Sequence, residues 1–188
     1  MRALLLIEFH SGCLFPFIKS NQLEFTDLSF ALTDIDSLLT QSIENALVES
    51  ENIEALIASL NIIFFNRLTD FHSIKIVTAM KDEILKRNGN INIQKLSSMF
   101  YYSEKHIRRL FFQYIGTSPK MFMRIARVNQ ALCLLQSKTM NFTDIAMQTG
   151  FFDQPHFIHD FKSICGLTPQ EYMCDMSVFY NDKYKFPV

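Results

Sequence analysis

The sequence predicts a mainly α protein. Two helix-turn-helix subdomains are joined by a long spacer helix and preceded by a short N-terminal segment that is partly β and then helical. The main observation is a repeat: Phe111 followed by GTSP at 116–119 recurs fifty positions later as Phe161 followed by GLTP at 166–169. The second observation is a helical period of apolar residues from about residue 34 onward. Each copy of the repeat closes a stretch with the pattern of a short helix, a turn and a second helix.

The charge distribution separates the chain into two parts, although the net charge of its 188 residues is only −1. Residues 1–70 contain three basic and ten acidic side chains, whereas residues 90–174 contain nine basic and five acidic ones. This asymmetry predicts two modules, with a polyanionic partner on the second. We therefore expect an N-terminal segment at 1–70, a second domain at 73–174 and a C-terminal tail at 175–188.

Several classes of protein are excluded by what the sequence lacks. The four cysteines (Cys13, Cys133, Cys165 and Cys174) have no metal-ligand spacing, so we expect reduced thiols in a cytoplasmic protein. No stretch approaches the roughly 20 apolar residues of a membrane span. There is no GxSxG, phosphate loop or HExxH motif, so we expect no enzyme, no catalytic residue and no cofactor.

The N-terminal segment is expected to change from strand to helix. Residues 3–18 are apolar and interrupted by Gly12 and Pro16, which predicts one or two short strands, and residues 20–33 are expected to form a loop or a weak strand. Asp34 is the expected cap of a first helix, whose apolar face would be Ile35, Leu39, Ile43, Ala46 and Leu47.

A second helix is expected from Asn52, with an apolar stripe of Ile53, Ile57, Leu60 and Phe64. Its spacing has two interpretations: a seam that pairs two copies of the chain through residues 34–68, or ordinary core packing. A third helix is expected over residues 73–87, with Ile76, Met80, Ile84 and Leu85 inward, and the sequence Asn-Gly-Asn at 88–90 is expected to stop it.

The first helix-turn-helix unit follows directly. A short helix carries Ile93, Leu96 and Met99, and Ser103 is the expected cap of a second helix that ends near Tyr114. The spacing of the second helix buries Ile107, Leu110, Phe111 and Tyr114. Lys105, Arg108 and Arg109 then lie on the opposite face, near the start of the helix that would enter the major groove of DNA. The planar guanidinium of arginine matches the two acceptors of guanine.

The spacer helix and the second unit complete the pattern. The spacer is expected from about Lys120 to Ser137, with Phe122, Ile125, Ala126, Ala131, Leu132 and Leu135 inward. In the second unit, Thr143 is the expected cap of its first helix and Asp153 the cap of its second, with Phe157, Phe161 and Ile164 inward. The outer face would present Gln154, Pro155, His156, Ile158 and His159, together with Asp160, whose charge would oppose a phosphate.

These residues resemble the AraC/XylS-type DNA-binding domain over about residues 73–174. The resemblance rests on Leu96, Ile107, Phe111 and GTSP at 116–119, on Arg127, Ala131, Leu134 and Leu135, and on Ile145, Ala146, Gly150, Phe151, Asp153, Gln154, His156, Phe157, Phe161, Lys162, Gly166, Thr168, Pro169 and Tyr172. It implies a seven-helix, two-lobed domain that binds double-stranded DNA and regulates transcription, often by activation through RNA polymerase. The DNA-contacting positions it implies are Ser103, Lys105, His106, Arg108 and Arg109, then Gln154, Pro155, His156, Ile158 and His159. The front segment is similar to the end of a sensor segment, for which the sequence names no effector.

Three alternatives stand beside this interpretation. The cationic face could be an ordinary solvated helix face, and His106 could be a surface histidine rather than a phosphate contact. His156 and His159 have a spacing that could suit a metal, but only Asp153 and Asp160 stand near them, so we expect no metal site. The domain could also be a protein-interaction module that modulates another regulator without specific DNA binding. Binding to DNA that weakens steeply with salt would distinguish the two functions.

Overall fold

The computed structural model describes residues 6–9, 12–26, 28–68, 71–137 and 140–175, and all regular secondary structure in these ranges is helical. The N-terminal elements are α1 (Phe15–Ile18), the 3-10 helix η1 (Gln22–Phe25), α2 (Leu32–Ile35), α3 (Ser37–Glu49), α4 (Ile53–Arg67) and α5 (Phe71–Lys86). They are followed by α6 (Ile93–Phe100), α7 (Glu104–Tyr114), α8 (Pro119–Ser137), α9 (Phe142–Gln148), α10 (Gln154–Cys165) and α11 (Pro169–Asp175).

The chain divides into two compact units. Unit 1 consists of residues 1–78 and 105–117, and unit 2 consists of residues 79–104 and 118–188. None of the described helices combines the length and the hydropathy needed to cross a lipid bilayer.

The prediction that the front of the chain is partly β is wrong for the described residues. Phe15–Ile18 form the single turn α1, and residues 20–33 contain η1 and the start of α2. Pro16 occupies the first turn of α1, where its fixed φ is compatible with a helix and its missing N–H costs nothing. The prediction relied on apolar content and treated Pro16 as a break. A proline is equally compatible with the first turn of a helix, which is where Pro16 lies. Residues 3–5, 10 and 11, also part of the expected strands, lie outside the described ranges.

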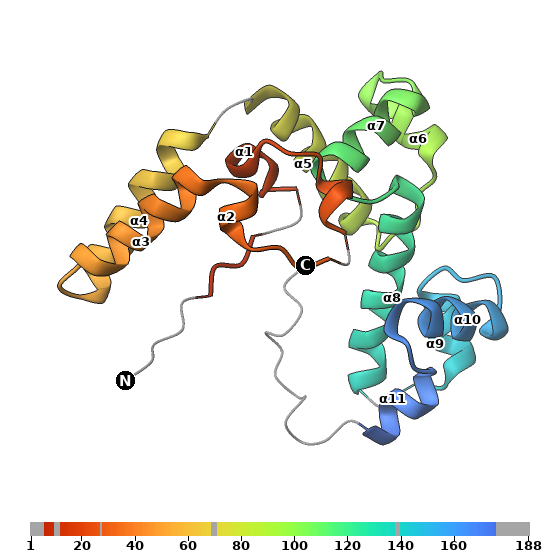
Figure 1. The fold of residues 1–188 in the computed structure, drawn as a ribbon. Helices are drawn as coiled ribbons and strands as arrows, with labels where there is room; N and C mark the ends of the chain where they lie inside the picture. The colour runs from red at the N-terminus through yellow and green to blue at the C-terminus, as the bar shows by residue number, and fades with distance from the viewer. Residues whose placement is uncertain (1–5, 10–11, 27, 69–70, 138–139, 176–188) are drawn as a thin grey trace. The chain divides into compact units, whose positions relative to one another are not determined.

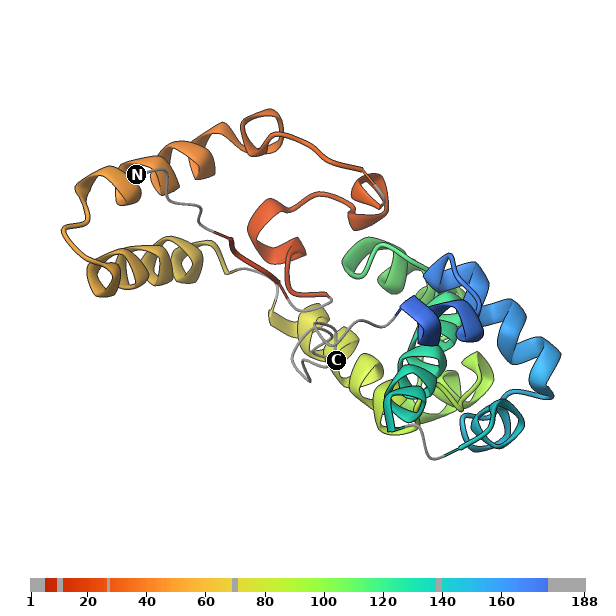
Figure 2. The same cartoon turned by 90° about the horizontal axis from the view of Figure 1, so that it is seen from below.

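The helices α3 and α4 form an antiparallel pair in unit 1 (Figures 1 and 2). The cap of α3 is Asp36, whose carboxylate accepts from the backbone N–H of Leu39 at 2.8 Å, and not Asp34, which lies inside α2. As predicted, Asn52 begins α4, accepting from the N–H of Ala55 at 2.8 Å.

An ion pair connects the start of α3 to the end of α4. Arg67, at the end of α4, donates through Nη2 to Asp36 Oδ1 at 3.2 Å and through Nη1 to the carbonyl of Phe17 at 3.3 Å. The hydrogen bond from Arg67 lowers the pKa of Asp36, and the N–H of Leu39 lowers it further. One guanidinium thus joins α1, α3 and α4.

The helical pair leaves much of its apolar surface exposed. Leu39, Ala46 and Leu60 are buried, but Leu47, which the sequence placed on the inner face, is 45% exposed. The exposed large apolar side chains of the pair are Leu38, Leu47, Val48, Ile53, Ile57, Ile62 and Phe65. Half of the predicted stripe on α4 therefore faces solvent in the single chain.

A second cluster in unit 1 packs the front segment against α7. Val77 of α5 is buried with Leu110 and Tyr114 of α7, and the ring of Phe15 lies 4.3 Å from that of Tyr114. On the other side of the segment, Thr26 Oγ1 donates to the carbonyl of Gly116 at 2.8 Å. The front segment is thus held to α7 and to the turn that follows it.

The core of unit 2 forms around the spacer helix α8, against which α9, α10 and α11 pack (Figure 1). Its centre combines the fully buried Ala131 of α8 with Ile145 of α9 and the aromatic pair Phe157 and Phe161 of α10. The expected inward face of α8 is confirmed at Phe122, Ala126, Ala131, Leu132 and Leu135, whereas Ile125 is only partly buried.

Glycines stand where the chain turns at the end of α5 and between α9 and α10, as the sequence predicted. The N–H of Gly89 donates to the carbonyl of Ile84 at 2.9 Å, which ends α5 at the predicted place. Gly150 has φ +77, and an added Cβ would lie 1.8 Å from Asn90 Oδ1. Gly150 is therefore required both by its backbone angle and by the close approach of Asn90.

We predict that Ala131→Phe lowers the free energy of unfolding by about 1–3 kcal/mol, because Ala131 is fully buried and a larger side chain overpacks the core around α8. Urea unfolding followed by circular dichroism measures the change. The matched control is Cys133→Leu on the same helix, where the native side chain is exposed. Equal stability of Ala131→Phe and Cys133→Leu would contradict the packing described for α8.

Candidate nucleic-acid interface

The helix α7 separates apolar and cationic side chains as the sequence predicts. Its buried residues are Ile107, Leu110, Phe111 and Tyr114, each at most 5% exposed. Lys105, Arg108 and Arg109 are all exposed, and Ser103 lies exposed immediately before the helix. Because the buried face fixes the rotation of α7, the three cations are presented to solvent together.

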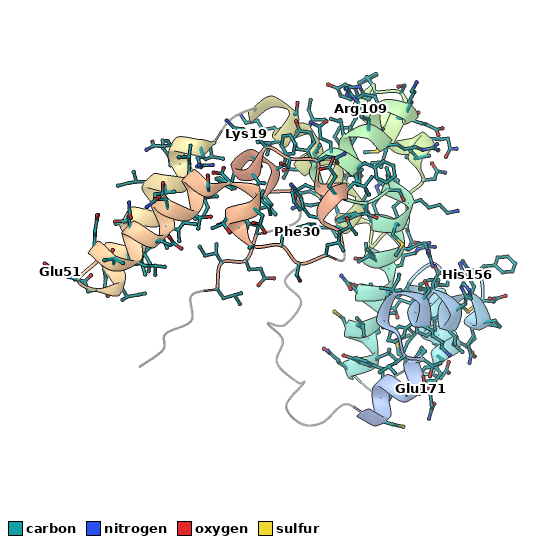
Figure 3. All side chains as sticks on the ribbon, viewed as in Figure 1. Lys19, Phe30, Glu51, Arg109, His156 and Glu171 are labelled. Carbon is teal, nitrogen blue, oxygen red and sulfur yellow. The ribbon has the colours of Figure 1, made fainter. Side chains whose placement is uncertain are left out.

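His106 lies beside this cationic face and is half-buried. Its Nδ1 lies 3.4 Å from Nη2 of Arg109, one turn further along α7. In the tautomer that leaves Nδ1 unprotonated, the imidazole accepts a hydrogen bond from the guanidinium. His106 can therefore orient Arg109, a role that the sequence did not suggest. Arg109 is labelled in Figure 3.

The second helix-turn-helix unit begins with α9, and the prediction of its cap was wrong. Asn141, not Thr143, caps α9, and its Oδ1 accepts from the N–H of Asp144 at 2.9 Å. Thr143 lies inside the first turn, where its hydroxyl donates to Oε1 of Gln154 at 2.7 Å. The Thr143 hydroxyl thus connects α9 to the first residue of α10 and holds the amide of Gln154.

The start of α10 is formed as predicted. Asp153 caps the helix by accepting from the N–H of His156 at 2.8 Å, and Pro155 occupies the first turn. Behind this turn, Phe157 and Phe161 are fully buried. The helix is thereby fixed in rotation by two aromatic rings one turn apart.

The predicted outer face of α10 is less uniform than that of α7. Pro155 and His159 are exposed, whereas Gln154 and His156 are half-buried. Ile158 is partly buried and packs against the core of unit 2. The ring of His156 (labelled in Figure 3) lies 5.5 Å from that of Phe151, with its Nδ1 3.5 Å from the N–H of Phe152. The structure thus presents the five predicted residues to very different extents.

Asp160 does not belong to the outer face, contrary to the prediction. Its side chain is only 6% exposed, and Arg124 of α8 donates to both its carboxylate oxygens, through Nε at 3.1 Å and Nη2 at 2.8 Å. Burial raises the pKa of Asp160, but hydrogen bonds and charge from Arg124 outweigh it and the net pKa is lowered. The carboxylate is therefore a charged tie between α10 and α8 and does not oppose a phosphate.

Arg127 of α8 supports the turn before α10. Its guanidinium lies 5.1 Å from the centre of the Phe151 ring, and its Nη1 donates to the carbonyl of Gly150 at 3.4 Å. Burial lowers the pKa of Arg127, because it disfavours the charged guanidinium. The cation–π contact with Phe151 partly offsets this cost of burying the charge. Arg127 and Phe151 both belong to the motif shared with the AraC/XylS-type domain, and in the structure they contact each other and support the turn at Gly150.

Two exposed aromatic residues in the turns were not predicted as site residues. Tyr101, in the turn after α6, is 94% exposed and has φ +58, and Phe152, just before α10, is 90% exposed. A non-glycine residue with positive φ is uncommon and marks a constrained turn. Their exposure carries no periodic signal, because both lie outside helices; the sequence indicated only that one of Tyr101 and Tyr102 in this turn could reach a phosphate.

Within the described residues, no three His, Cys, Asp or Glu side chains gather in a geometry that could hold a metal ion. His156 and His159 instead each approach the carboxylate of Asp160 at 3.6 Å. Each of the helices α7 and α10 presents polar side chains to solvent opposite a buried face, which is suited to surface recognition.

Comparison with known proteins agrees with this geometry. A model of a helix-turn-helix domain matches residues 96–174. The chain is 33% identical over 88 residues to the probable transcription factor PqrA of Proteus vulgaris, covering 47% of this chain and 72% of that protein. It is 28% identical over 101 residues to an uncharacterised helix-turn-helix regulator of Haemophilus influenzae, covering 54% of this chain and 34% of that protein. The match thus spans most of PqrA and about a third of the Haemophilus regulator.

The fold is similar to that of a solved structure, the C-terminal domain of AraT, a response regulator from Geobacillus stearothermophilus. The two share 24% identity with a TM-score of 0.51, over 58% of this chain and 93% of that domain. The matched domain and these relatives place the chain in the class of helix-turn-helix transcriptional regulators. Within that class, the chain belongs to the AraC/XylS-type family.

We predict that Asp160→Asn lowers the free energy of unfolding by about 2 kcal/mol, because it removes the charge that compensates the largely buried Arg124. Urea unfolding at neutral pH measures it. The control is Asp82→Asn, whose carboxylate is 63% exposed and 3.8 Å from Lys81, and which should change stability very little.

The same carboxylate gives a pH dependence. Because folding lowers the pKa of Asp160 from its ordinary 3.8, its stabilisation is present above that pH and is lost as pH falls through the lower folded value. The unfolding free energy of Asp160→Asn should therefore fall less steeply than that of the wild type below about pH 4. Parallel acid profiles would show that the pair contributes nothing at neutral pH.

Proposed function

We propose that this chain is a sequence-specific DNA-binding transcriptional regulator that reads two adjacent major grooves, one with α7 and one with α10. The observation that carries the proposal is the cationic face of α7, where Lys105, Arg108 and Arg109 are exposed opposite a fully buried apolar face. Membership of the AraC/XylS-type family supports it, and PqrA and the Haemophilus relative are both described as transcriptional regulators.

The two units contribute differently in this proposal. Cations on α7 supply charge-assisted contacts to guanine and to phosphates. The face of α10 supplies Gln154, whose amide pairs with adenine, together with Pro155, His156, Ile158 and His159. In the proposal, the spacer α8 sets the two contacts about one turn of DNA apart, roughly 34 Å. Activation would then follow from contact with RNA polymerase on the neighbouring promoter.

A binding selection tests the function as a whole. Purified chain is incubated with genomic fragments at two salt concentrations, and the bound fragments are sequenced. We expect a two-part motif with centres about one helical turn apart, and affinity that falls steeply with salt. Absence of salt-sensitive DNA binding would refute the proposal and favour the protein-interaction alternative.

We predict that Arg108→Ala weakens binding to the selected site by about 1–3 kcal/mol and relaxes the preference at one base position. The reason is that a bidentate arginine contact specifies guanine, whereas a phosphate contact carries no sequence information. Fluorescence anisotropy with the selected site and its single-base variants measures both effects.

The matched control for Arg108 is Arg87→Ala. Arg87 is exposed at the end of α5, where it pairs with Glu83, and its loss should leave the base preference unchanged. An equal loss for Arg108→Ala on every sequence would assign Arg108 to the DNA backbone instead of a base.

We further propose that residues 34–68 pair two copies of the chain. The support is the exposed apolar surface of α3 and α4, on which Val48 is 85% and Ile57 is 52% exposed. A helical pair with this much uncovered apolar surface has a driving force for association, because contiguous exposed patches are uncommon on monomers. Pairing would place two reading domains on repeated half-sites.

We predict that Ile57→Glu shifts the chain from dimer to monomer while leaving its helical content unchanged, because the residue is exposed in the single chain and a buried carboxylate would oppose pairing. Sedimentation velocity over a concentration series measures the shift. Glu54→Gln, one turn earlier on α4, is the control and should remain dimeric. A monomeric wild type would exclude this interface.

A further inference from the structure

A hollow of 390 Å³ lies beside α7 within unit 1. Polar side chains from both of its sides line it: Lys19 and Asn21 from the front segment, and Arg109 and Gln113 from α7. None of the lining residues is acidic. Two cations and two amides around one recess, with no carboxylate among the described residues that line it, favour an anion as its occupant.

Lys19 is unusual in the segment to which it belongs. Residues 1–70 have ten acidic and only three basic side chains, of which Arg2 lies outside the described ranges and Arg67 is paired with Asp36. Lys19 is exposed, and its backbone has φ +56, a left-handed conformation that is less favourable for a lysine than for a glycine. A cation is therefore placed beside a cationic helix, at a position where glycine would be favoured.

Contacts on either side hold the Lys19 turn in place. Before it, the ring of Phe15 lies 4.3 Å from Tyr114 of α7, and after it Thr26 donates to the carbonyl of Gly116 at 2.8 Å. Asn21 accepts from the N–H of Leu23 at 3.2 Å, which leaves its amide NH₂ as a donor. The turn is thus a preorganised part of unit 1, and this lowers the entropic cost of a contact through Lys19.

We propose that this hollow binds a backbone phosphate of the DNA between Lys19 and Arg109, so that the front segment forms part of the DNA interface. The apolar part of the lining, from Phe15, Leu23 and Phe112, packs against the adjoining deoxyribose. The inference rests on the proposed function, because it extends the DNA-facing side of α7 through Arg109. A segment that is acidic overall then contributes one attractive charge at the place where it meets the helix. Lys19 and Arg109 are labelled in Figure 3.

The test compares the salt dependence of DNA binding for the full chain, Lys19→Asn and Lys19→Arg. Asparagine removes the charge but tolerates positive φ, so Lys19→Asn should unfold at the wild-type temperature or above. We expect its slope of log affinity against log salt to be smaller by about 0.9, the value for one phosphate. Its affinity should fall by about three- to tenfold, equally on selected and unrelated DNA. Lys19→Arg should retain the wild-type slope.

Two controls define the site. Lys75→Gln removes an exposed lysine of α5 that does not line the hollow, and should leave the slope unchanged. A set of DNA sites, each with one phosphate replaced by neutral methylphosphonate, locates the contact. One replacement should weaken the wild type and leave Lys19→Asn unaffected, and the same replacement should lose its effect in Arg109→Ala.

Other outcomes would overturn the inference. An unchanged slope and affinity for Lys19→Asn would show that Lys19 does not contact DNA. Stabilisation of the wild type, but not of Lys19→Asn, by millimolar inorganic phosphate, with unchanged DNA binding, would assign the hollow to a free anion. A wild type without salt-sensitive DNA binding would refute the proposed function itself, whereas salt-sensitive binding with no effect of Lys19 refutes only this inference.

Discussion

Fully buried aromatic residues fix the rotation of α7 and α10, and the outward faces of both helices depend on this constraint. Phe111 of α7 and Phe161 of α10 are both fully buried and occupy equivalent places in the repeat. A helix whose apolar face is held in a core has no freedom to turn, so its opposite side chains face solvent at fixed positions. In α7 these are Lys105 and Arg108. Base readout needs such rigidity, because a bidentate arginine discriminates only when its guanidinium plane is held in register with the base edge.

The parts of the chain with strong periodicity could be predicted from sequence, and the parts that depend on distant partners could not. The buried faces of α7 and α8 follow from i, i+3, i+4 spacing alone, and Asp153 caps α10 as expected. The exact cap of α3 could not be chosen from composition, since Asp34 and Asp36 are equivalent as residue types. Asp36 caps the helix, and Arg67, thirty-one positions further along the chain, also donates to its carboxylate. Long-range partners of this kind leave no local trace in a sequence.

Asp160 shows the same limit within the candidate site. Its position on α10, fifty residues after the buried Leu110 of α7, falls on the inward face by helical spacing, and a carboxylate is seldom buried without a partner. That partner, Arg124, lies thirty-six positions earlier on α8. The spacing could place Asp160 inward, but only the packed arrangement of α8 and α10 identifies Arg124 as the partner that makes a buried carboxylate tolerable. The hidden pairing also changes the charge balance, because the charges of Arg124 and Asp160 compensate each other inside unit 2.

The pairing of Arg124 with Asp160 inside unit 2 makes the outer faces of α7 and α10 unequal in charge. In unit 2, Arg124 is committed to Asp160 and Arg127 to the turn at Gly150, so its inner cations stabilise the fold. In unit 1, Lys105, Arg108 and Arg109 are exposed. In the proposed function, phosphate contacts dominate affinity and base contacts determine specificity, so this asymmetry would assign most of the binding strength to α7. The α10 face would then contribute through hydrogen bonding and shape. Its weaker charge is an advantage for selectivity, because a second strongly cationic helix would raise affinity for every sequence alike.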